Sequence, residues 1–310
     1  MQFSTIRIAL DAVADYWTAL IFRELFMGAE QWSELEAALE VPPSTLNKRL
    51  KELVALGCLE RRAAPGRKES RYVLTEMGRD LFPFQMAARE WQLTWDRRPG
   101  VFVTPWVHQC GAPLRCSSLC SQCHQLIENG DVRLEESSVV LVPYQAPPPR
   151  HRRGAGATAR DARAKSSSYP KVMAVIGNRR SSMVMSAILR GQVRFDEIVR
   201  QTGLPTATVS EQLKQLQLSN LVHSRLYQRR PDRYEYQASE AGIDLVGLAL
   251  QLISWANRWL ADRGAGATRA IHTDCGRAMH SRLVCSTCRE AVTLDTCHLD
   301  SLGATARTSA

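Results

Sequence analysis

The sequence predicts a mainly α-helical fold with small β hairpins, built from two tandem copies of one unit. Two observations predict it. A pattern of glycines, large apolar residues and cysteines recurs along the chain, and each copy shows the same order of helical and hairpin patterns. A long pattern that recurs at a nearly fixed spacing indicates a tandem duplication. We call residues 1–143 copy one and residues 171–300 copy two.

The repeat covers most of each copy, and the offset between equivalent residues grows by one residue only twice. Examples in chain order are Gly28 with Gly191, Leu50 with Leu213, Tyr72 with Tyr236, Trp91 with Trp255, His108 with His272, and Cys120 with Cys285. Chance does not keep such a match over this length.

Length and charge narrow the class of protein. A chain of 310 residues with 45% hydrophobic content can form two cores. No apolar run approaches the roughly 18 residues that a membrane span needs. The first residues, MQFSTIRIALDAVADYW, include Arg7, Asp11 and Asp15 and do not resemble a signal peptide. We therefore expect a soluble cytoplasmic protein, and the net charge of +9 favours a polyanionic partner.

Three helices are predicted at the start of copy one. Asp15 is placed to cap the first, which should end at Gly28, and apolar spacing over residues 32–39 predicts a short second helix. After the turn EVPPS, Ser44 is placed to cap a third helix that ends at Gly57. The leucines of this third helix share one face, and its other face is polar and basic.

The segment ERRAAPGRKESRYVLT follows, with a Pro-Gly turn between two possible strands. This order is that of a winged helix-turn-helix domain: a helix, a short helix, a turn, a basic helix and a basic hairpin. In that domain the third helix enters the DNA major groove and the hairpin, or wing, contacts the backbone. Each copy is therefore predicted to be a winged-helix domain followed by a small Cys/His knuckle.

The candidate DNA contacts are polar and basic side chains of the third helix and the wing. Lysine and arginine can neutralise phosphates or reach guanine, while the others can hydrogen-bond to bases or phosphates. Any one of them could instead belong to a solvated face, but the set favours DNA. In copy one they are Ser44, Thr45, Asn47, Lys48, Arg49, Lys51, Arg67, Lys68 and Arg71. In copy two they are Thr206, Thr208, Ser210, Gln212, Lys214, Arg229, Arg230 and Arg233.

A longer helix is predicted from about Glu76 to Trp95, with Pro83 bending it or delaying its start. Its apolar residues have the three-four spacing of a helix that packs along another helix. They are Leu81, Phe84, Ala88, Trp91 and Trp95, and their equivalents, which continue without interruption, are Leu245, Leu248, Leu252, Trp255 and Trp259. The spacing fits either core packing within each copy or a contact between copies.

Composition suggests the boundaries of the domains. Residues 144–170 are rich in Pro, Gly, Ala and Ser and are predicted to form a flexible basic linker, whose arginines could also touch phosphates. The predicted winged-helix domains are residues 1–100 and 171–263. The predicted knuckles are residues 101–143 and 264–300, and residues 301–310 are expected to be a disordered tail.

Eight of the nine cysteines lie in two clusters, each with a histidine and a Cys-x-x-Cys pair. A tetrahedral structural zinc site needs four such ligands. The predicted sets are His108, Cys110, Cys120 and Cys123 in copy one, and His272, Cys275, Cys285 and Cys288 in copy two. The spacing from His to the first Cys differs between the copies, so Cys116 and His280 are alternative ligands. Thiol-disulfide sensing and inert buried thiols are alternatives to zinc.

Copy one resembles the HxlR-type transcriptional regulators. The resemblance lies in DYWTALIFRELFMGAEQWSELEAAL, STLNKRLKELVALGCLERR and RYVLTEMGRDLFPFQMAAREW, and copy two is similar but more diverged in RFDEIVRQTGLPTATVSEQLKQLQLSNLV, RPDRYEYQASEAG and SWANRW. This resemblance implies winged-helix proteins that bind double-stranded DNA as homodimers through their terminal helices. Here the duplication is expected to replace the second subunit and form a pseudo-dimer, although a homodimer stays possible.

The expected function is sequence-specific DNA binding in transcription regulation, with copy one anchored in the major groove. Copy two has Glu211 and Gln212 where copy one has Lys48 and Arg49. The alternative is therefore that copy two no longer binds DNA and serves as a thiol, redox or ligand sensor, or as a partner module. The sequence contains no P-loop, nucleophile elbow or dinucleotide fingerprint, so we do not expect an enzyme.

Overall fold

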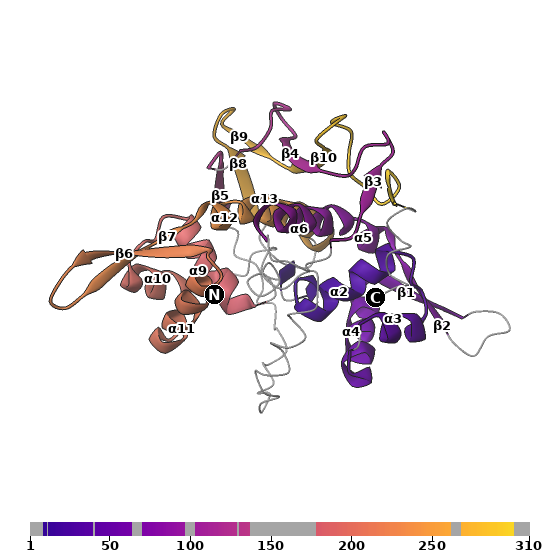
Figure 1. Cartoon of the computed structure of the whole chain (residues 1–310), viewed down its shortest axis with the longest axis horizontal. Helices are drawn as coiled ribbons and strands as arrows, with labels where there is room; N and C mark the ends of the chain where they lie inside the picture. Colours follow the sequence, from indigo (N-terminus) through magenta and orange to yellow (C-terminus); the bar gives the residue numbers. More distant parts are fainter. Residues whose placement is uncertain are drawn as a thin grey trace.

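The computed structural model describes residues 9–10, 12–39, 41–63, 70–96, 103–128, 130–136, 178–261 and 268–300. Both copies begin with three helices and a two-stranded wing, continue with a short and a long helix, and end in short strands (Figure 1). The predicted linker at 144–170 and tail at 301–310 lie outside the described residues, as do Arg67 and Lys68.

The elements of copy one are α2 (Tyr16–Phe26), α3 (Trp32–Leu39), α4 (Pro43–Leu56), β1 (Leu59–Ala63), β2 (Ser70–Leu74), α5 (Glu76–Arg79), α6 (Phe82–Trp95), β3 (Trp106–His108), β4 (Cys116–Cys120) and β5 (Val132–Glu136). Those of copy two are α9 (Arg179–Leu189), α10 (Phe195–Thr202), α11 (Thr206–Leu218), β6 (Val222–Gln228), β7 (Arg233–Ala238), α12 (Glu240–Ile243), α13 (Leu245–Leu260), β8 (Thr268–His272), β9 (Arg277–Met279), β10 (Ser281–Cys285) and β11 (Cys297–Leu299). The fold is the predicted one, two tandem winged helix-turn-helix units with small β wings.

Local signals set the ends of the first helices. The carboxylate of Asp15 caps α2 by accepting a hydrogen bond from the backbone N–H of Trp17, as predicted. Gly57 ends α4 in the left-handed conformation, with φ of 92°. Ser44 is not the cap of α4, because the helix begins one residue earlier at Pro43, whose missing N–H costs nothing in the first turn.

The predicted long helix is divided in both copies. In copy one α5 and α6 are separated at Asp80 and Leu81, and Pro83 lies in the first turn of α6, as expected for a delayed start. The sequence of copy two predicts an uninterrupted helix, yet α12 and α13 are separated at Asp244 with no proline present. The break therefore belongs to the fold and does not depend on Pro83.

Helices α6 and α13 pack against each other at the centre of the molecule (Figure 1), which settles the two interpretations of the apolar spacing in favour of a contact between copies. The indole N–H of Trp91 donates to the carbonyl of Ala241 at 2.8 Å. In the equivalent contact, Trp255 donates to the carbonyl of Met77, also at 2.8 Å. The reciprocity of the two contacts is that of a twofold interface, here formed within one chain.

The second pair of tryptophans repeats this reciprocity. Trp95 donates to the carboxylate of Asp244 at 2.6 Å, and Trp259 donates to that of Asp80 at 2.9 Å. Buried indoles need a partner for their N–H group, so these four bonds favour a single way of docking the two long helices.

The strands that follow the long helices also join the copies. Antiparallel β4 and β10 pair so that Cys120 lies opposite Ser281 and Cys116 opposite Cys285. Strand β3 of copy one pairs with β11 of copy two, and β5 of copy one pairs with β8 of copy two. The two knuckles therefore form one interlaced unit above α6 and α13 in Figure 1.

The core runs from the winged-helix domains through the central helices into this strand layer. Among its fully buried side chains are Phe22, Leu46, Leu50, Phe82 and Leu114. None of the helices in the described part of the chain has the length and apolar character that a membrane span requires.

Candidate nucleic-acid interface and metal clusters

Helix α4 presents a polar face away from the core of copy one. Leu46, Leu50 and Leu53 are buried beneath it. The opposite face exposes Ser44, Asn47, Lys48 and Lys51, and Thr45 is half-buried. In Figure 1 α4 and α11 lie on the side of the molecule opposite the β4–β10 strands, and the two wings extend outward at the ends.

Lys48 is available at this surface and Arg49 is not. The Lys48 side chain is 53% exposed, with only a long ion pair of 3.6 Å to Glu52. The Arg49 side chain is 19% exposed and is paired with Asp15 at 3.1 Å and Glu52 at 2.8 Å. Arg49 thus joins α4 to the beginning of α2, and its contact with DNA stays a prediction.

The equivalent position in copy two has the same structural role. Gln212 is 5% exposed. Its side-chain oxygen accepts hydrogen bonds from the amide of Asn178 at 3.1 Å and the hydroxyl of Ser181 at 2.7 Å. Asn178 caps α9 as Asp15 caps α2. The structure thus gives Gln212 a role in holding the first helix of its own domain, and its contact with DNA stays a prediction.

The outer face of α11 is less basic than that of α4. Thr206, Ser210 and Lys214 are exposed and Thr208 is half-buried. Glu211, at the position of Lys48, is exposed as well. Copy two therefore offers one lysine and several hydroxyls where copy one offers two available lysines.

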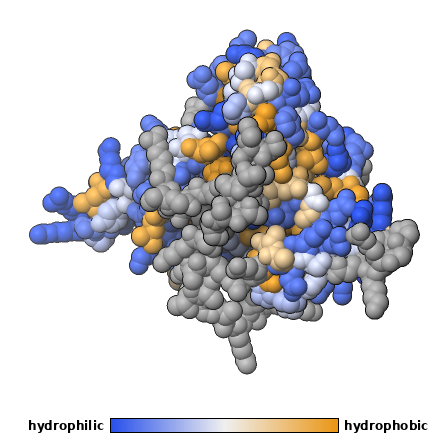
Figure 2. All heavy atoms as spheres, turned by 45° about the vertical axis from the view of Figure 1, so that its right-hand side comes forward, coloured by the Kyte–Doolittle hydropathy of each residue, from blue (hydrophilic) through white to orange (hydrophobic). Residues whose placement is uncertain are grey.

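The wings contribute further positive charge. Arg71 on β2 is half-exposed and pairs with Glu30 at 3.2 Å. In copy two Arg229, Arg230 and Arg233 are all exposed around the turn between β6 and β7. Hydrophilic side chains dominate this hairpin, which projects to the left in Figure 2.

Three basic residues on the wing strands were not among the predicted DNA contacts. Arg61 and Arg62 in β1 and Arg225 in β6 are all exposed, and Arg62 pairs with Glu60. Strand β1 buries only its first residue and exposes the other four. The signal was present in the sequence, since a two-stranded wing has one face toward solvent and its polar strand residues, like those at its tip, can contact a phosphate backbone.

The cysteines and histidines form two clusters whose membership differs from the prediction. One contains His108, Cys110, Cys285 and Cys288, and the other contains Cys120, Cys123, His272 and Cys275. All eight predicted residues are present, but each cluster joins the His and first Cys of one copy to the Cys-x-x-Cys pair of the other. The expectation of one self-contained site per copy is corrected, because the pairing of β4 with β10 exchanges the two cysteine pairs.

The distances within both clusters suit a tetrahedral metal ion. The four donor atoms of each cluster lie within 4.8 Å of one another. Sγ of Cys288 is 3.4 Å from Nδ1 of His108, and Sγ of Cys110 is 4.0 Å from Sγ of Cys285. A tetrahedron with zinc–sulfur bonds of about 2.3 Å has sulfur atoms about 3.8 Å apart. Cys110 and Cys285 are much too far apart for a disulfide, which needs about 2.05 Å, as are Cys120 and Cys275 at 4.0 Å, and the cysteines of both clusters are free thiols.

The local backbone favours the thiolate form of one cysteine in each Cys-x-x-Cys pair. Against a backbone hydrogen bond, burial and the neighbouring thiols raise the pKa of the other, Cys123 or Cys288. Burial disfavours the charged form of Cys120, but the backbone N–H groups of Cys123 and Gln122 stabilise it, and the net effect is a lowered pKa. The pKa of Cys285 is lowered in the same way, against the effect of burial, by the N–H groups of Cys288 and Thr287. Several backbone N–H groups that point at one sulfur stabilise its thiolate, which is the form that binds a metal ion.

The two alternative ligands do not join these clusters. Burial raises the pKa of the Cys116 thiol, which lies outside both sets. His280 is exposed, and its backbone N–H donates to the hydroxyl of Ser121. His108 and His272 are both fully buried and direct Nδ1 at a cysteine of the other copy, so the donor sets of three cysteines and one histidine fit a structural zinc ion.

Comparison with known proteins identifies the family. The model of the HxlR-like helix-turn-helix family matches residues 12–99 and 175–263, which together are more than half of the chain. The chain belongs to the HxlR-like helix-turn-helix family. The two matches coincide with the two winged-helix units, and thus both copies are HxlR-like.

Curated relatives agree with this assignment. The uncharacterized HTH-type transcriptional regulator Rv3095 of Mycobacterium tuberculosis is 29% identical over 126 residues, which are 41% of this chain and 80% of that protein. The uncharacterized HTH-type transcriptional regulator YvaP of Bacillus subtilis is 35% identical over 89 residues, or 28% of this chain and 82% of that protein. Both relatives are named as HTH-type transcriptional regulators.

Proposed function

We propose that this HxlR-like chain is a sequence-specific DNA-binding transcription regulator that acts as a single-chain pseudo-dimer. The reciprocal bonds of Trp91 and Trp255 across α6 and α13 support this proposal most strongly, because they relate the two winged-helix units as the subunits of a dimer are related. Two recognition helices held in that way suit an operator with two half-sites.

The two copies contribute unequally to binding. Lys48 and Lys51 of α4 neutralise phosphates or reach guanine, and Asn47 is placed to hydrogen-bond to a base edge. On α11 the exposed Glu211 repels phosphates, so copy two relies on Lys214 and on the wing arginines. Copy one is therefore the anchor, and copy two binds a weaker half-site or mainly the backbone.

The two Cys/His clusters hold structural zinc in this proposal. A closed set of four protein ligands leaves no open coordination position for a substrate, so the metal has a structural role. Because every cluster takes two ligands from each copy, zinc would fasten the copies together beyond the contact of α6 with α13.

A second candidate function follows from the reversed charge at Glu211. In this alternative copy two has ceased to bind DNA and serves as a sensor of thiol oxidation or of a ligand, or as a partner module. The exposed thiol of Cys110 is the feature that favours a redox response.

A gel-shift titration over a range of salt concentrations separates the two functions. For every phosphate that the protein no longer neutralises, the plot of log affinity against log salt should become less steep by about 0.9. Lys48→Ala/Lys51→Ala should therefore weaken binding and make the plot less steep, and Arg229→Ala/Arg230→Ala should do the same if copy two binds DNA. An effect of the lysine variant alone supports the sensor alternative, and no effect of either variant contradicts DNA binding through these surfaces.

Arg282→Ala is the matched control for this titration. Arg282 is exposed on β10, in the interlaced strand unit on the opposite side of the molecule from α4 and α11. Its removal lowers the net charge by one, half the change in either double variant, and should leave the salt slope unchanged.

A further inference from the structure

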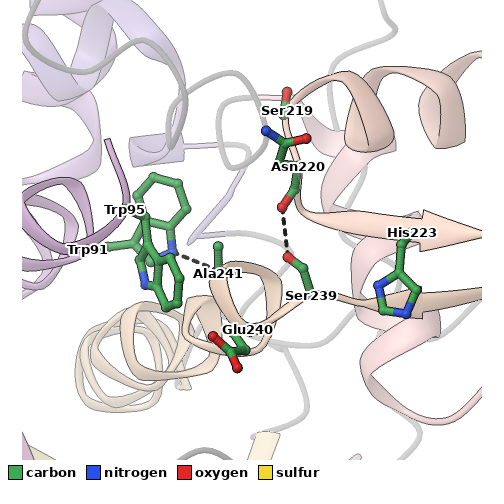
Figure 3. Close-up of a pocket in the computed structure, with 8 residues that line it drawn as sticks. All are labelled: Trp91, Trp95, Ser219, Asn220, His223, Ser239, Glu240 and Ala241. Atoms are coloured by element: carbon green, nitrogen blue, oxygen red, sulfur yellow. Dashed lines mark hydrogen bonds between the residues drawn. The ribbon is translucent and has the colours of Figure 1, made fainter. Parts of the chain in front are cut away.

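A cavity of about 500 Å³ opens between the two copies. Trp91 and Trp95 of α6 line one side, and the remaining lining residues come from copy two around the end of α11 and the base of its wing (Figure 3). Those residues are Ser219, Asn220, His223, Ser239, Glu240 and Ala241. The volume suits a small organic molecule, and two indoles beside one carboxylate are a setting for a cation.

The pseudo-symmetric position on the other side of the molecule shows what such a cation would bind. There the guanidinium of Arg258 pairs with Glu76 at 2.8 Å and with Asp80 at 2.7 Å. It also lies over the ring of Trp259, 4.9 Å from the centroid. Two carboxylates and one indole thus surround a guanidinium that the chain itself supplies.

Three of the four partners recur in or beside the cavity, and the arginine does not: Glu240 and Trp95 line the cavity, and the carboxylate of Asp244 lies next to it, where it accepts the indole N–H of Trp95. By the sequence repeat, Glu240 is the equivalent of Glu76, Asp244 of Asp80, and Trp95 of Trp259. The equivalent of Arg258 is Thr94, whose hydroxyl donates to the carbonyl of Glu90 in its own helix. Within the described part of the chain no cationic side chain pairs with Glu240 or Asp244.

We propose that this cavity binds a small organic cation, of the guanidinium or amine class, in the place that Arg258 fills on the other side. The cation would pair with Glu240 and Asp244 and lie against the ring of Trp95, with its apolar part between the indoles and the base of the wing. Residues of both copies line the cavity, so a bound ligand would contact both copies and affect the interface between them. The site is independent of whether the chain binds DNA.

The test uses n-butylguanidinium as the probe and neutral n-butylurea, of nearly the same shape, as its control. Titration of the full-length protein, followed by tryptophan fluorescence, should show saturable binding of the cation with a Kd of about 1 mM or tighter. The urea should bind at least about tenfold more weakly, since the missing charge removes the ion pairs and the cation–π contact.

Three variants test whether the probe binds in this cavity. Glu240→Gln should weaken binding of the probe by about fourfold, because the pair that it removes is exposed to solvent. Thr94→Arg should abolish binding, because the new guanidinium takes the contacts that Arg258 makes on the other side. Glu76→Gln is the matched control, since its cation site is already filled, and it should change the affinity by less than about twofold.

Circular dichroism would first show that each variant is folded. The proposal is overturned if n-butylurea binds as well as the cation, if no saturation is reached, if Glu76→Gln weakens binding as much as Glu240→Gln, or if Thr94→Arg still binds the probe. Because the readout is ligand binding, these results hold whatever the gel-shift titration shows.

Discussion

Sγ of Cys288 lies 3.4 Å from Nδ1 of His108, although the two residues belong to different copies of the repeat. The equivalent pair, Cys123 and His272, is separated by 3.3 Å. Each cluster therefore bridges the copies, and a metal ion in either one would act as a cross-link within the chain. Removal of such a metal ion should loosen the contact between the copies.

Paired substitutions distinguish ligand sets that cross between copies from sets within one copy. Cys110→Ser/Cys285→Ser removes two ligands from one cluster and leaves the other complete, so the purified protein should keep about one zinc per chain. Cys110→Ser/Cys120→Ser removes one ligand from each cluster and should weaken both. Elemental analysis after mild chelation measures the zinc that each variant keeps. If Cys110→Ser/Cys120→Ser kept more zinc than Cys110→Ser/Cys285→Ser, the crossed arrangement would be contradicted.

The tryptophan bonds across α6 and α13 should contribute to stability. Trp91→Phe and Trp255→Phe each remove one buried N–H donor to a backbone carbonyl of the other copy. The free energy of unfolding should fall by about 1 kcal/mol for each bond, in addition to any loss of packing. Urea denaturation gives the change.

Trp32→Phe is the control for this pair. The indole nitrogen of Trp32 is buried without a hydrogen-bond partner, so the substitution removes ring atoms but no bond. A loss of stability from Trp32→Phe as large as that from the central tryptophans would show that packing alone explains their effect.

The ion pair of Arg49 with Asp15 predicts that Arg49 contributes to stability, whereas the exposed Lys51 on the same helix does not. Arg49→Ala breaks the connection of α4 to Asp15 and should lower the free energy of unfolding by about 1 kcal/mol. Lys51→Ala, on the exposed face, should leave stability within about 0.5 kcal/mol. Chemical denaturation and gel shift on the same samples test this, and an unchanged stability of Arg49→Ala would refute the structural role.

Gly78 and Gly242 each lie close to a backbone carbonyl of another segment, so we expect substitution of either glycine to lower stability strongly. A Cβ at Gly78 would lie 2.2 Å from the carbonyl oxygen of Cys58, and one at Gly242 would lie 2.2 Å from that of Leu221. Because a backbone atom cannot move aside cheaply, either alanine variant should lose about 2 kcal/mol or more. Thermal unfolding measures the loss.

Gly247→Ala is the matched control for the glycine variants. Gly247 lies inside α13, and a Cβ there would approach only the hydroxyl of Ser118, at 4.0 Å. Alanine favours a helix interior over glycine, so this variant should be more stable by up to about 1 kcal/mol. A destabilised Gly247→Ala would show that the close approach is not the cause at Gly78 and Gly242.

The fold could be predicted from the sequence because its signals are local. The cap at Asp15, the stop at Gly57 and the buried face of Leu46 and Leu50 each depend on residues close in the chain. The repeat then extends these assignments from one copy to the other.

The arrangement of the site depends on contacts that local patterns do not contain. The eight metal-cluster residues are visible from their spacing, but spacing within a copy cannot show that β4 pairs with β10 and exchanges the cysteine pairs. Arg49 and Gln212 lie on the polar face of a helix, which predicts that they contact DNA. In the structure they bind Asp15 and Asn178, which are more than thirty residues away in sequence, so local patterns do not reveal these contacts.

Selection of bound duplexes from a pool of random DNA tests most directly whether one chain presents two reading heads. If it does, the enriched sequences should contain two half-sites with centres about 10 base pairs apart, or a multiple of that spacing. One of the two should be more strongly defined, because copy two keeps Lys214 at the position of Lys51 but has Glu211 at the position of Lys48. Enrichment of a single half-site, or of no sequence at all, would contradict the account.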